Sequence, residues 1–440
     1  MNDQRVMNRW IVVVGALLIQ LCLGAIYAWS VFTKKLTIPI AEGGVYGFSA
    51  QQAAWVFSAG LAVFAIVMVA SGRYLPKIGP RPLAMAGGLL LGAGYILGGI
   101  FGSTFGAQFF FIGILGGAGI GLAYVVPISV AIRWFPDRKG MVTGLAVAGF
   151  GFGATIWVKL AGSWFGGLLN TTHVLGRPGV QSVFIIYGIV FAVVVLLGST
   201  VMIYPPEGWK PEGWEPAPPV AGKATGTIEL TSGEMLRTPQ FYMLWLMFIG
   251  SALAGLMVIY CIRLFGIDAL QASGAVADMK TAGTIAGTAM AWYAILNGLG
   301  RIAWGTVSDA IGRKMALLAM CTFQGIIMLL FFKMGASPLG LIIGASIIGF
   351  NFGGNFALFP AATADYFGNK NVGPNYGWVF TAYGVAGIIG PQVAGYFKDM
   401  ARGAGVELWT KPFIIAGVSC LVAAALALGL KAPRAHGSAS

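Results

Sequence analysis

The sequence predicts an all-α membrane protein with twelve transmembrane helices in two pseudo-symmetric bundles of six. Three observations carry this prediction. Of the 440 residues, 58% are hydrophobic and only 9% are charged, a balance far from that of a soluble domain. Apolar runs of about 18 to 25 residues recur along the chain, and each can cross a hydrocarbon core as a helix. A short loop motif appears once in each half of the chain.

The apolar periodicity places the spans in order along the chain. The first run is too long for a signal peptide and has no small-residue cleavage pattern, so we interpret it as a transmembrane helix. The predicted spans are 10–32, 51–71, 83–103, 105–132, 141–163, 181–203, 240–264, 283–304, 315–333, 339–361, 376–397 and 411–430.

The net charge of +13 arises from Lys and Arg in the short loops on one side of the spans. This asymmetry predicts that both termini are cytoplasmic, in a multi-pass protein of the cell's inner (plasma) membrane. We therefore expect the lipid bilayer, and no nucleic acid, as a partner.

One long polar interval, residues 204–238, separates the two sets of six spans. Its proline and glycine content is typical of an extended linker. The predicted domains are an N-terminal bundle (1–203), a cytoplasmic linker (204–238) and a C-terminal bundle with a short cytoplasmic tail (239–440). The linker repeat "PEGWKPEGW" contains Trp209 and Trp214, which are expected either to lie at the membrane interface or to bind a partner.

The loop motif reads "GRYLPKIGPR" at 72–81 and "GTVSDAIGRK" at 305–314, each after the second span of its half. We expect its glycines to permit a tight cytoplasmic turn, and Asp309 to accept hydrogen bonds from a neighbouring helix N-terminus. Two homologous bundles also predict a binding site between them, near the bilayer midplane. Gating and assembly are assigned to Gly72, Gly79, Arg81, Gly305, Asp309, Gly312 and Arg313.

Arg301 lies inside the apolar stretch "ILNGLGRIAWG", about 12 Å below the cytoplasmic end of its helix. An arginine at such depth costs about 2.5–3.5 kcal/mol on insertion scales, and it normally faces a bundle interior or a water-filled cavity. All 14 acidic residues fall in loops or at span ends. The guanidinium therefore suits a carboxylate ligand, and the alternatives are internal pairing and gating.

Three further polar side chains are expected to act on the anion or on Arg301. Asn297 precedes Arg301 by four residues and shares its helix face, where it can orient the guanidinium or contact substrate. Arg263 and Lys398 lie toward span ends, where we expect them to attract anions into an outer vestibule.

No sequence pattern indicates a metal, a cofactor or catalysis. The four cysteines lie inside apolar spans at irregular spacing, so we expect core residues and not ligands or disulfides. HExxH, CxxC and Walker-type loops do not occur. We therefore expect no metal, no cofactor and no enzyme activity.

The chain resembles a known family. The double loop motif, the twelve spans and the central linker resemble the major facilitator superfamily over essentially the whole length. Within it, "RWFPDRKG" (133–140), "SGEMLRTPQFYMLW" (232–245) and "NFGGNFALFPAATADYFG" with "NYG" (351–377) resemble the oxalate/formate antiporter family. The resemblance implies the major facilitator fold, alternating access and a monomer. One departure is Pro76, which stands where the family has an acid.

The resemblance also implies a substrate site. In the oxalate/formate family an arginine at the position of Arg301 faces the anion. The other positions that match binding residues of the family are Tyr27, Gln52, Tyr124, Phe352 and Phe356. Without the resemblance, an aromatic pair at helical spacing such as Phe352 and Phe356 is more typical of plain core.

Tyr383 is the departure that bears on substrate choice. The oxalate exchanger that typifies the family has a lysine here, which gives it two cations for a dianion. One buried cation balances one carboxylate, because a second negative charge would be left unpaired at a cost of several kcal/mol. The sequence therefore favours a monocarboxylate such as lactate, pyruvate or formate, whose hydroxyl or keto oxygen Tyr383 could bind.

The sequence thus predicts a secondary transporter of small organic anions. The alternatives are a dicarboxylate exchanger of the oxalate/formate type and, from another class, a membrane sensor without transport. No span centre holds a titratable carboxylate or histidine, and Asn297 stands where similar proton symporters often place an acid. This favours exchange or facilitated transport, with a counter-anion or a proton as the open choice of coupling partner.

Overall fold

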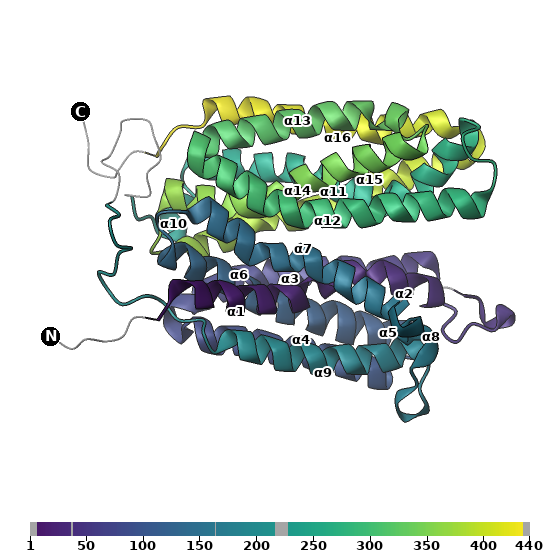
Figure 1. Ribbon diagram of the computed structural model, residues 1–440, viewed down its shortest axis with the longest axis horizontal. Helices are drawn as coiled ribbons and strands as arrows, with labels where there is room; N and C mark the ends of the chain where they lie inside the picture. The colour runs from purple at the N-terminus through teal and green to yellow at the C-terminus, as the bar shows by residue number, and fades with distance from the viewer. Residues whose placement is uncertain (1–6, 37, 163, 216–227, 434–440) are drawn as a thin grey trace. The chain divides into compact units, whose positions relative to one another are not determined.

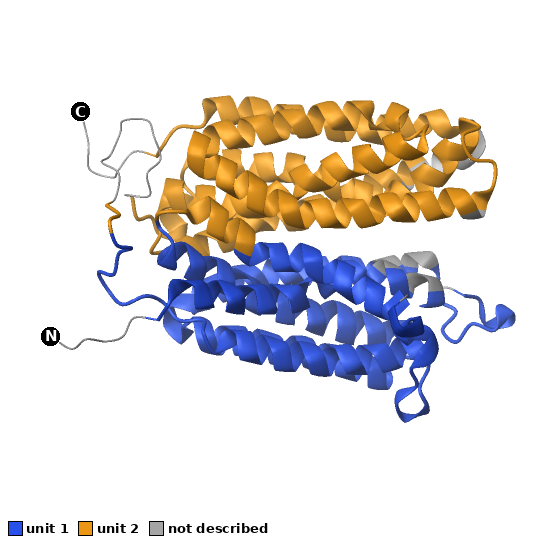
Figure 2. Cartoon of the chain, viewed as in Figure 1, with its two compact units in different colours: residues 1–136, 146–212 blue, residues 137–145, 213–440 orange. Residues whose placement is uncertain are grey.

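The computed structural model describes residues 7–36, 38–162, 164–215 and 228–433. Every regular element in these ranges is a helix (Figure 1). The chain divides into two compact units, Met1–Pro136 with Ala146–Glu212 and Asp137–Leu145 with Gly213–Ser440 (Figure 2). The predicted all-α class is confirmed.

In the first unit, long helices alternate with short connecting ones. The long helices are α1 (Arg9–Leu23), α3 (Ala50–Ile78), α4 (Pro80–Phe101), α6 (Gly117–Trp134), α7 (Lys139–Gly162) and α9 (Gly179–Ser199). The shorter elements are η1 (Gly24–Ala28), α2 (Trp29–Leu36), η2 (Ile40–Glu42), α5 (Phe105–Gln108), η3 (Phe109–Gly116), η4 (Trp164–Gly166), α8 (Leu168–Thr171) and η5 (Val174–Gly176). The 3-10 segment η1 continues α1 directly, and the π-helical η3 leads into α6. Such interruptions often mark hinges or functional positions.

The second unit contains the longest helices of the described chain. Its elements are α10 (Ser232–Met235), α11 (Pro239–Ala272), α12 (Met279–Ile311), α13 (Arg313–Met334), α14 (Pro338–Phe367), α15 (Val372–Ala404), η6 (Val406–Trp409) and α16 (Thr410–Gly429). The side chains of Thr238, Asp278 and Ser337 accept a hydrogen bond from the first turns of α11, α12 and α14. These caps satisfy backbone donors that have no partner inside the helix.

Ten helices of the described ranges are long and apolar enough to cross a membrane, and each coincides with a predicted span. The two remaining predicted spans, 283–304 and 376–397, lie on α12 and α15, which have 33 residues each. Both helices are long enough, but they carry more polar side chains, including Asn297 and Arg301 on α12. Ten of the twelve predicted spans therefore have both the length and the apolar composition of a membrane span in the described residues, and the other two lie on helices that have the length.

The two copies of the loop motif end their helices in the same way. Gly79 ends α3 with a φ of 87°, and α4 begins at the next residue. Gly312 ends α12 with a φ of 85°, and α13 begins at the next residue. Glycine adopts this left-handed conformation without the steric cost that a side chain adds. The predicted tight turns are confirmed in both copies.

The first part of the linker packs against α6. The Arg133 guanidinium lies 3.8 Å from the centre of the Tyr204 ring, and the Trp134 and Trp209 rings are 4.9 Å apart. Trp209 therefore contacts its own unit, which neither of the two predicted roles had included. Residues 216–227 of the predicted linker lie outside the described residues.

The predicted domain boundaries at 203 and 239 stay a prediction. The compact units differ from them, since residues up to Glu212 group with the first unit and Asp137–Leu145 with the second. Cys22, Cys261, Cys321 and Cys420 are buried and free, as predicted.

Candidate functional site

Arg301 is completely buried in the second unit, with 0% of its surface exposed. Its Nε and Nη2 atoms both donate to the side-chain oxygen of Asn297, each at 3.1 Å. The two residues are four apart on α12, so helix geometry alone places them on one face. Because a guanidinium can only donate, Asn297 must present its oxygen to Arg301. Its Nδ2 group is buried without a hydrogen-bond partner among the described residues.

Phe356 of α14 packs against the guanidinium of Arg301. The Arg301 Cζ atom lies 4.2 Å from the centre of the Phe356 ring, at cation–π distance. Phe352 packs edge-on against Phe356 with ring centres 5.3 Å apart, and Tyr383 of α15 does so at 5.4 Å. The structure thus brings together all five substrate-site residues that the sequence predicts in this half: Arg301, Asn297, Phe352, Phe356 and Tyr383.

The close approach of α14 to α12 depends on a glycine. A Cβ atom at Gly353 would overlap the backbone of Asn297, so only glycine lets the two helices touch there. Small residues at a crossing permit this packing in membrane helices. The crossing therefore positions the aromatic side chains of α14 beside the polar face of α12.

Two aromatic residues of this cluster were not predicted. Phe248 of α11 stacks on Phe359 and lies 6.4 Å from Tyr383, measured between ring centres. Phe380 lies 5.0 Å from Tyr383 on α15. The sequence offers no signal that singles them out, because each lies in a helix with several other aromatic residues, such as Trp245 beside Phe248 and Trp378 beside Phe380.

Tyr27 and Tyr124 both contact Phe150 in the first unit. The Tyr27 ring lies 5.0 Å from Phe150, and Tyr124 lies 5.5 Å from Phe150 and 5.0 Å from Phe64. Phe64 and Phe150 therefore complete an aromatic cluster of which the sequence predicted only the two tyrosines. Phe150 belongs to the glycine-dense run "GLAVAGFGFG" at residues 144–153.

Gln52, the third predicted site residue of the first half, lies at the start of α3. Its side-chain oxygen accepts a hydrogen bond from the Ser49 backbone at 2.9 Å, and its own backbone N–H donates to the Ser49 hydroxyl at 3.0 Å. This reciprocal pair is a capping box. Gln52 therefore stabilises the first turn of α3. Its contact with substrate stays a prediction.

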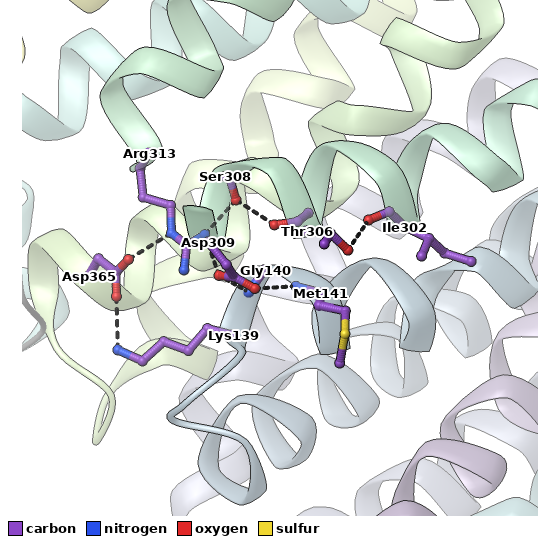
Figure 3. Close-up of polar contacts among 10 residues, drawn as sticks. Lys139, Gly140, Met141, Ile302, Thr306, Ser308, Asp309, Arg313 and Asp365 are labelled. Carbon is purple, nitrogen blue, oxygen red and sulfur yellow. Dashed lines mark hydrogen bonds and ion pairs between the residues drawn. The ribbon is translucent and has the colours of Figure 1, made fainter. Parts of the chain in front are cut away.

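The second loop motif carries an ion-pair network (Figure 3). Arg313 contacts Asp309 and Asp365, each at 2.7 Å, and Lys139 contacts Asp365 at 2.8 Å. Asp309 also accepts hydrogen bonds from the backbone of Gly140 at 2.9 Å and Met141 at 2.8 Å. These two donors lie in the first turn of α7, so the predicted contact of Asp309 with a helix N-terminus is confirmed. The sequence did not predict Lys139 or Asp365 as partners.

The same first turns of α7 lie directly on α12. Gly140 and Gly305 face each other so closely that a Cβ on either would overlap the other's backbone. A Cβ at Gly144 would overlap the backbone carbonyl of Arg301. The first turns of α7 therefore pack directly against the backbone of α12 at Arg301 and Gly305.

The first copy of the motif is different. Arg81 is exposed and makes no ion pair within the described part of the chain. Pro76 lies inside α3 where an acid would be needed to build the matching network. The ionic part of the motif is thus confined to the second copy.

Comparison with known sequences identifies the family. The sequence profile described as "Major Facilitator Superfamily" matches residues 10–283 and 270–440, nearly the whole chain. The chain belongs to the Major Facilitator Superfamily. It is therefore an integral membrane transporter and not an enzyme.

Relatives within the superfamily are named for small anions. The chain is 29% identical over 423 residues to the oxalate:formate antiporter of Oxalobacter formigenes, covering 96% of this chain and 91% of the relative. It is 26% identical over 428 residues to monocarboxylate transporter 13 of Bos taurus, covering 96% and 89%.

A solved structure supports the superfamily fold. A proton:xylose symporter bound to 6-bromo-6-deoxy-D-glucose matches with a TM-score of 0.66 at 13% identity, covering 96% of this chain and 95% of that chain. At this identity the match concerns the fold alone.

Proposed function

We propose that this transporter carries small monocarboxylates, namely lactate, pyruvate or formate, with the carboxylate bound to Arg301. The observation that carries the proposal is the completely buried guanidinium of Arg301, held in place by Asn297 and Phe356. We further propose a location in the cell's inner membrane, with both termini cytoplasmic.

The energetics of burial support an anion at this point. A charged side chain inside a membrane helix is costly, and it is normally retained where it serves a substrate or ion pathway. The planar fork of an arginine matches both oxygens of a carboxylate. Asn297 adds a buried Nδ2 donor beside it, whose desolvation an arriving acceptor would offset.

The aromatic surroundings support a small anion of single charge. Phe352, Phe356 and Tyr383 are each at most 2% exposed, so little polar surface is offered to a second carboxylate. The names of the relatives point to small carboxylates in general, since one exchanges oxalate and formate and another carries monocarboxylates. The uptake experiment decides whether the coupling partner is a counter-anion or a proton.

Access to the site is proposed to alternate between the two sides of the membrane. The network of Arg313, Asp365 and Lys139 holds the first residues of α7 on α12, beside the backbone of Arg301. We propose that release of this segment opens the route to Arg301 from the linker end. Tyr27, Tyr124 and Gln52 stay proposed substrate contacts.

The proposal is tested by uptake of labelled lactate, pyruvate, formate and oxalate into proteoliposomes of the purified protein. Saturable uptake of at least one monocarboxylate, with oxalate weaker, is the expected result. Each substrate is measured with and without internal anion, and with and without a pH gradient. Uptake that requires internal anion indicates exchange, and uptake driven by the pH gradient indicates proton symport. Saturable oxalate uptake without monocarboxylate uptake would contradict the proposal in favour of the dicarboxylate alternative.

Tyr383→Lys is expected to shift selectivity toward the dianion. A second cation beside Arg301 could balance the second carboxylate of oxalate, which otherwise stays unpaired. We expect the ratio of oxalate to lactate uptake to rise at least about tenfold, equivalent to ~1.4 kcal/mol. The measurement is competitive uptake of the two labelled acids.

Tyr383→Phe is the matched control, because it keeps the ring and adds no charge. It is expected to leave the preference for singly charged substrates unchanged. Uptake of acids with a hydroxyl or keto oxygen should fall relative to uptake of formate. An unchanged oxalate ratio in a folded Tyr383→Lys protein would show that charge at this position does not set selectivity.

A further inference from the structure

A cavity lies at the beginning of α12, where this helix borders the last turns of α11. Its volume is about 690 Å³, enough for a small organic anion with several waters. Its lining consists of Arg263 and Ile267 from α11, the N-cap residue Asp278, and Met279, Gly283, Thr284 and Gly287 from α12. Every lining residue belongs to the second unit.

The cavity is separate from the Arg301 site but lies on the same face of α12. Gly287 precedes Arg301 by fourteen residues, which corresponds to about 21 Å along a helix. Gly283 precedes it by eighteen residues, five complete turns, so the two positions are aligned along the helix. An anion in the cavity would therefore lie over the face that also carries the buried arginine.

The glycines of the cavity keep space open. A Cβ atom at Gly287 would have nothing within 4 Å, and one at Gly283 would meet only the Ile267 side chain at 3.7 Å. Gly353 behaves differently, since its missing side chain lets two helices touch. Close packing therefore does not account for the two glycines at the start of α12.

Arg263 supplies the positive charge among the described residues that line the cavity. Its side chain is exposed and forms no hydrogen bond or ion pair with any residue that the structure describes. The carboxylate of Asp278 caps α12, where it accepts bonds from the Thr281 backbone and hydroxyl, both at 2.7 Å. The positive helix N-terminus partly offsets this negative charge. The side chain of Lys398, the other predicted vestibule cation, lies outside the described residues.

We propose that this cavity is an entry site for small carboxylates, which bind weakly to Arg263 before they reach Arg301. The inference rests on the proposed function, because it assumes that the transported substrate is such an anion. A single exposed guanidinium, with a carboxylate nearby, binds an anion only weakly. Weak binding suits a site that must release its ligand toward a deeper one.

Arg263→Gln is expected to lower kcat/KM for carboxylate uptake about threefold and to leave the maximal rate unchanged. An exposed charge contributes little binding energy, but it raises the rate at which the anion reaches the protein. The dependence of kcat/KM on ionic strength should also become weaker. Gly287→Leu, which fills the cavity without changing charge, is expected to lower kcat/KM as well. Both are measured with substrate applied from the side opposite to the linker.

Lys333→Gln is the matched control. Lys333 is an exposed cation in the last turn of α13 and does not line the cavity. Its replacement should leave kcat/KM within error of wild type. An unchanged kcat/KM in Arg263→Gln, or an equal loss in Lys333→Gln, would overturn the proposal in favour of general surface charge.

A second measurement does not depend on transport. The thiol of Gly287→Cys is labelled with an anionic methanethiosulfonate (2-sulfonatoethyl) and with its cationic trimethylammonium analogue. The four native cysteines are buried. We expect faster labelling by the anionic reagent, slowing by formate or lactate, and loss of the anionic preference in Gly287→Cys with Arg263→Gln. Equal rates, or a faster cationic reagent, would overturn the anion site.

The two measurements also separate the two proposals. If wild type moves no monocarboxylate but the anionic preference persists and depends on Arg263, the proposed function fails and the anion site stands. If monocarboxylates are transported and Arg263→Gln changes neither kcat/KM nor labelling, the entry site fails alone.

Discussion

Arg301→Leu is expected to reduce carboxylate uptake to background, a loss of at least about 100-fold in kcat/KM. Two hydrogen bonds from a charged donor contribute about 1.5–3 kcal/mol each, and the substitution removes both together with the charge. Arg301→Lys keeps the charge but loses the planar fork, so it should retain only a small part of the activity. The measurement is uptake of the best substrate from the panel into proteoliposomes.

Thermal unfolding of the same variants separates a substrate role from a structural one. Replacing a buried ion by an apolar side chain is often neutral or stabilising, because the desolvation cost disappears. We therefore expect Arg301→Leu to unfold at the temperature of wild type or above it. If Arg301 instead belonged to an internal ion pair or a gate, its loss would lower the free energy of unfolding by several kcal/mol. A destabilised protein, or one that transports normally, would contradict the assignment of Arg301 to the substrate.

Asp365→Asn is expected to lower the free energy of unfolding by about 3–5 kcal/mol, the cost of breaking a buried ion pair from one side. Asp365 contacts both Lys139 and Arg313, whose side chains are 7% and 9% exposed. The substitution leaves these two cations facing a neutral amide. Thermal unfolding in detergent is the direct measurement, and a lower midpoint is the expected result.

Glu207→Gln is the control for Asp365→Asn. Glu207 is exposed, so solvent screens the interactions of its carboxylate. Such exposed interactions contribute about 0–1 kcal/mol, and the midpoint should stay close to wild type. Equal midpoints for Asp365→Asn and wild type would show that the network does not stabilise this conformation.

The side chains that cluster around Arg301 could be predicted from the sequence because their signals are local. Arg301 interrupts an apolar helix, and Asn297 shares its face through helical spacing alone. The aromatic residues of α14 follow the same spacing, but only the family resemblance connected them and Tyr383 to a ligand. Helical spacing and motif resemblance both involve short stretches of chain, in which the helix fixes the relative positions of the side chains.

The missed features depend on contacts across long distances in sequence. Lys139 and Asp365 are 226 residues apart, and no periodicity relates them. Phe64 and Phe150 become neighbours of the tyrosines only through packing of separate helices. Two of the twelve predicted spans, on α12 and α15, are less apolar than the other ten because these helices carry more polar side chains, although their lengths suit a membrane.

Helix α7 changes unit along its length, since Asp137–Leu145 groups with the second unit and Ala146 onward with the first. This has a consequence for biogenesis. At about 5–20 residues per second, Asp365 leaves the ribosome ~10–45 s after Lys139. For most of that interval the start of α7 lacks both Asp309 and Asp365, while the rest of the helix can already pack. The first turns of α7 therefore acquire these native neighbours only late in synthesis, long after they are made.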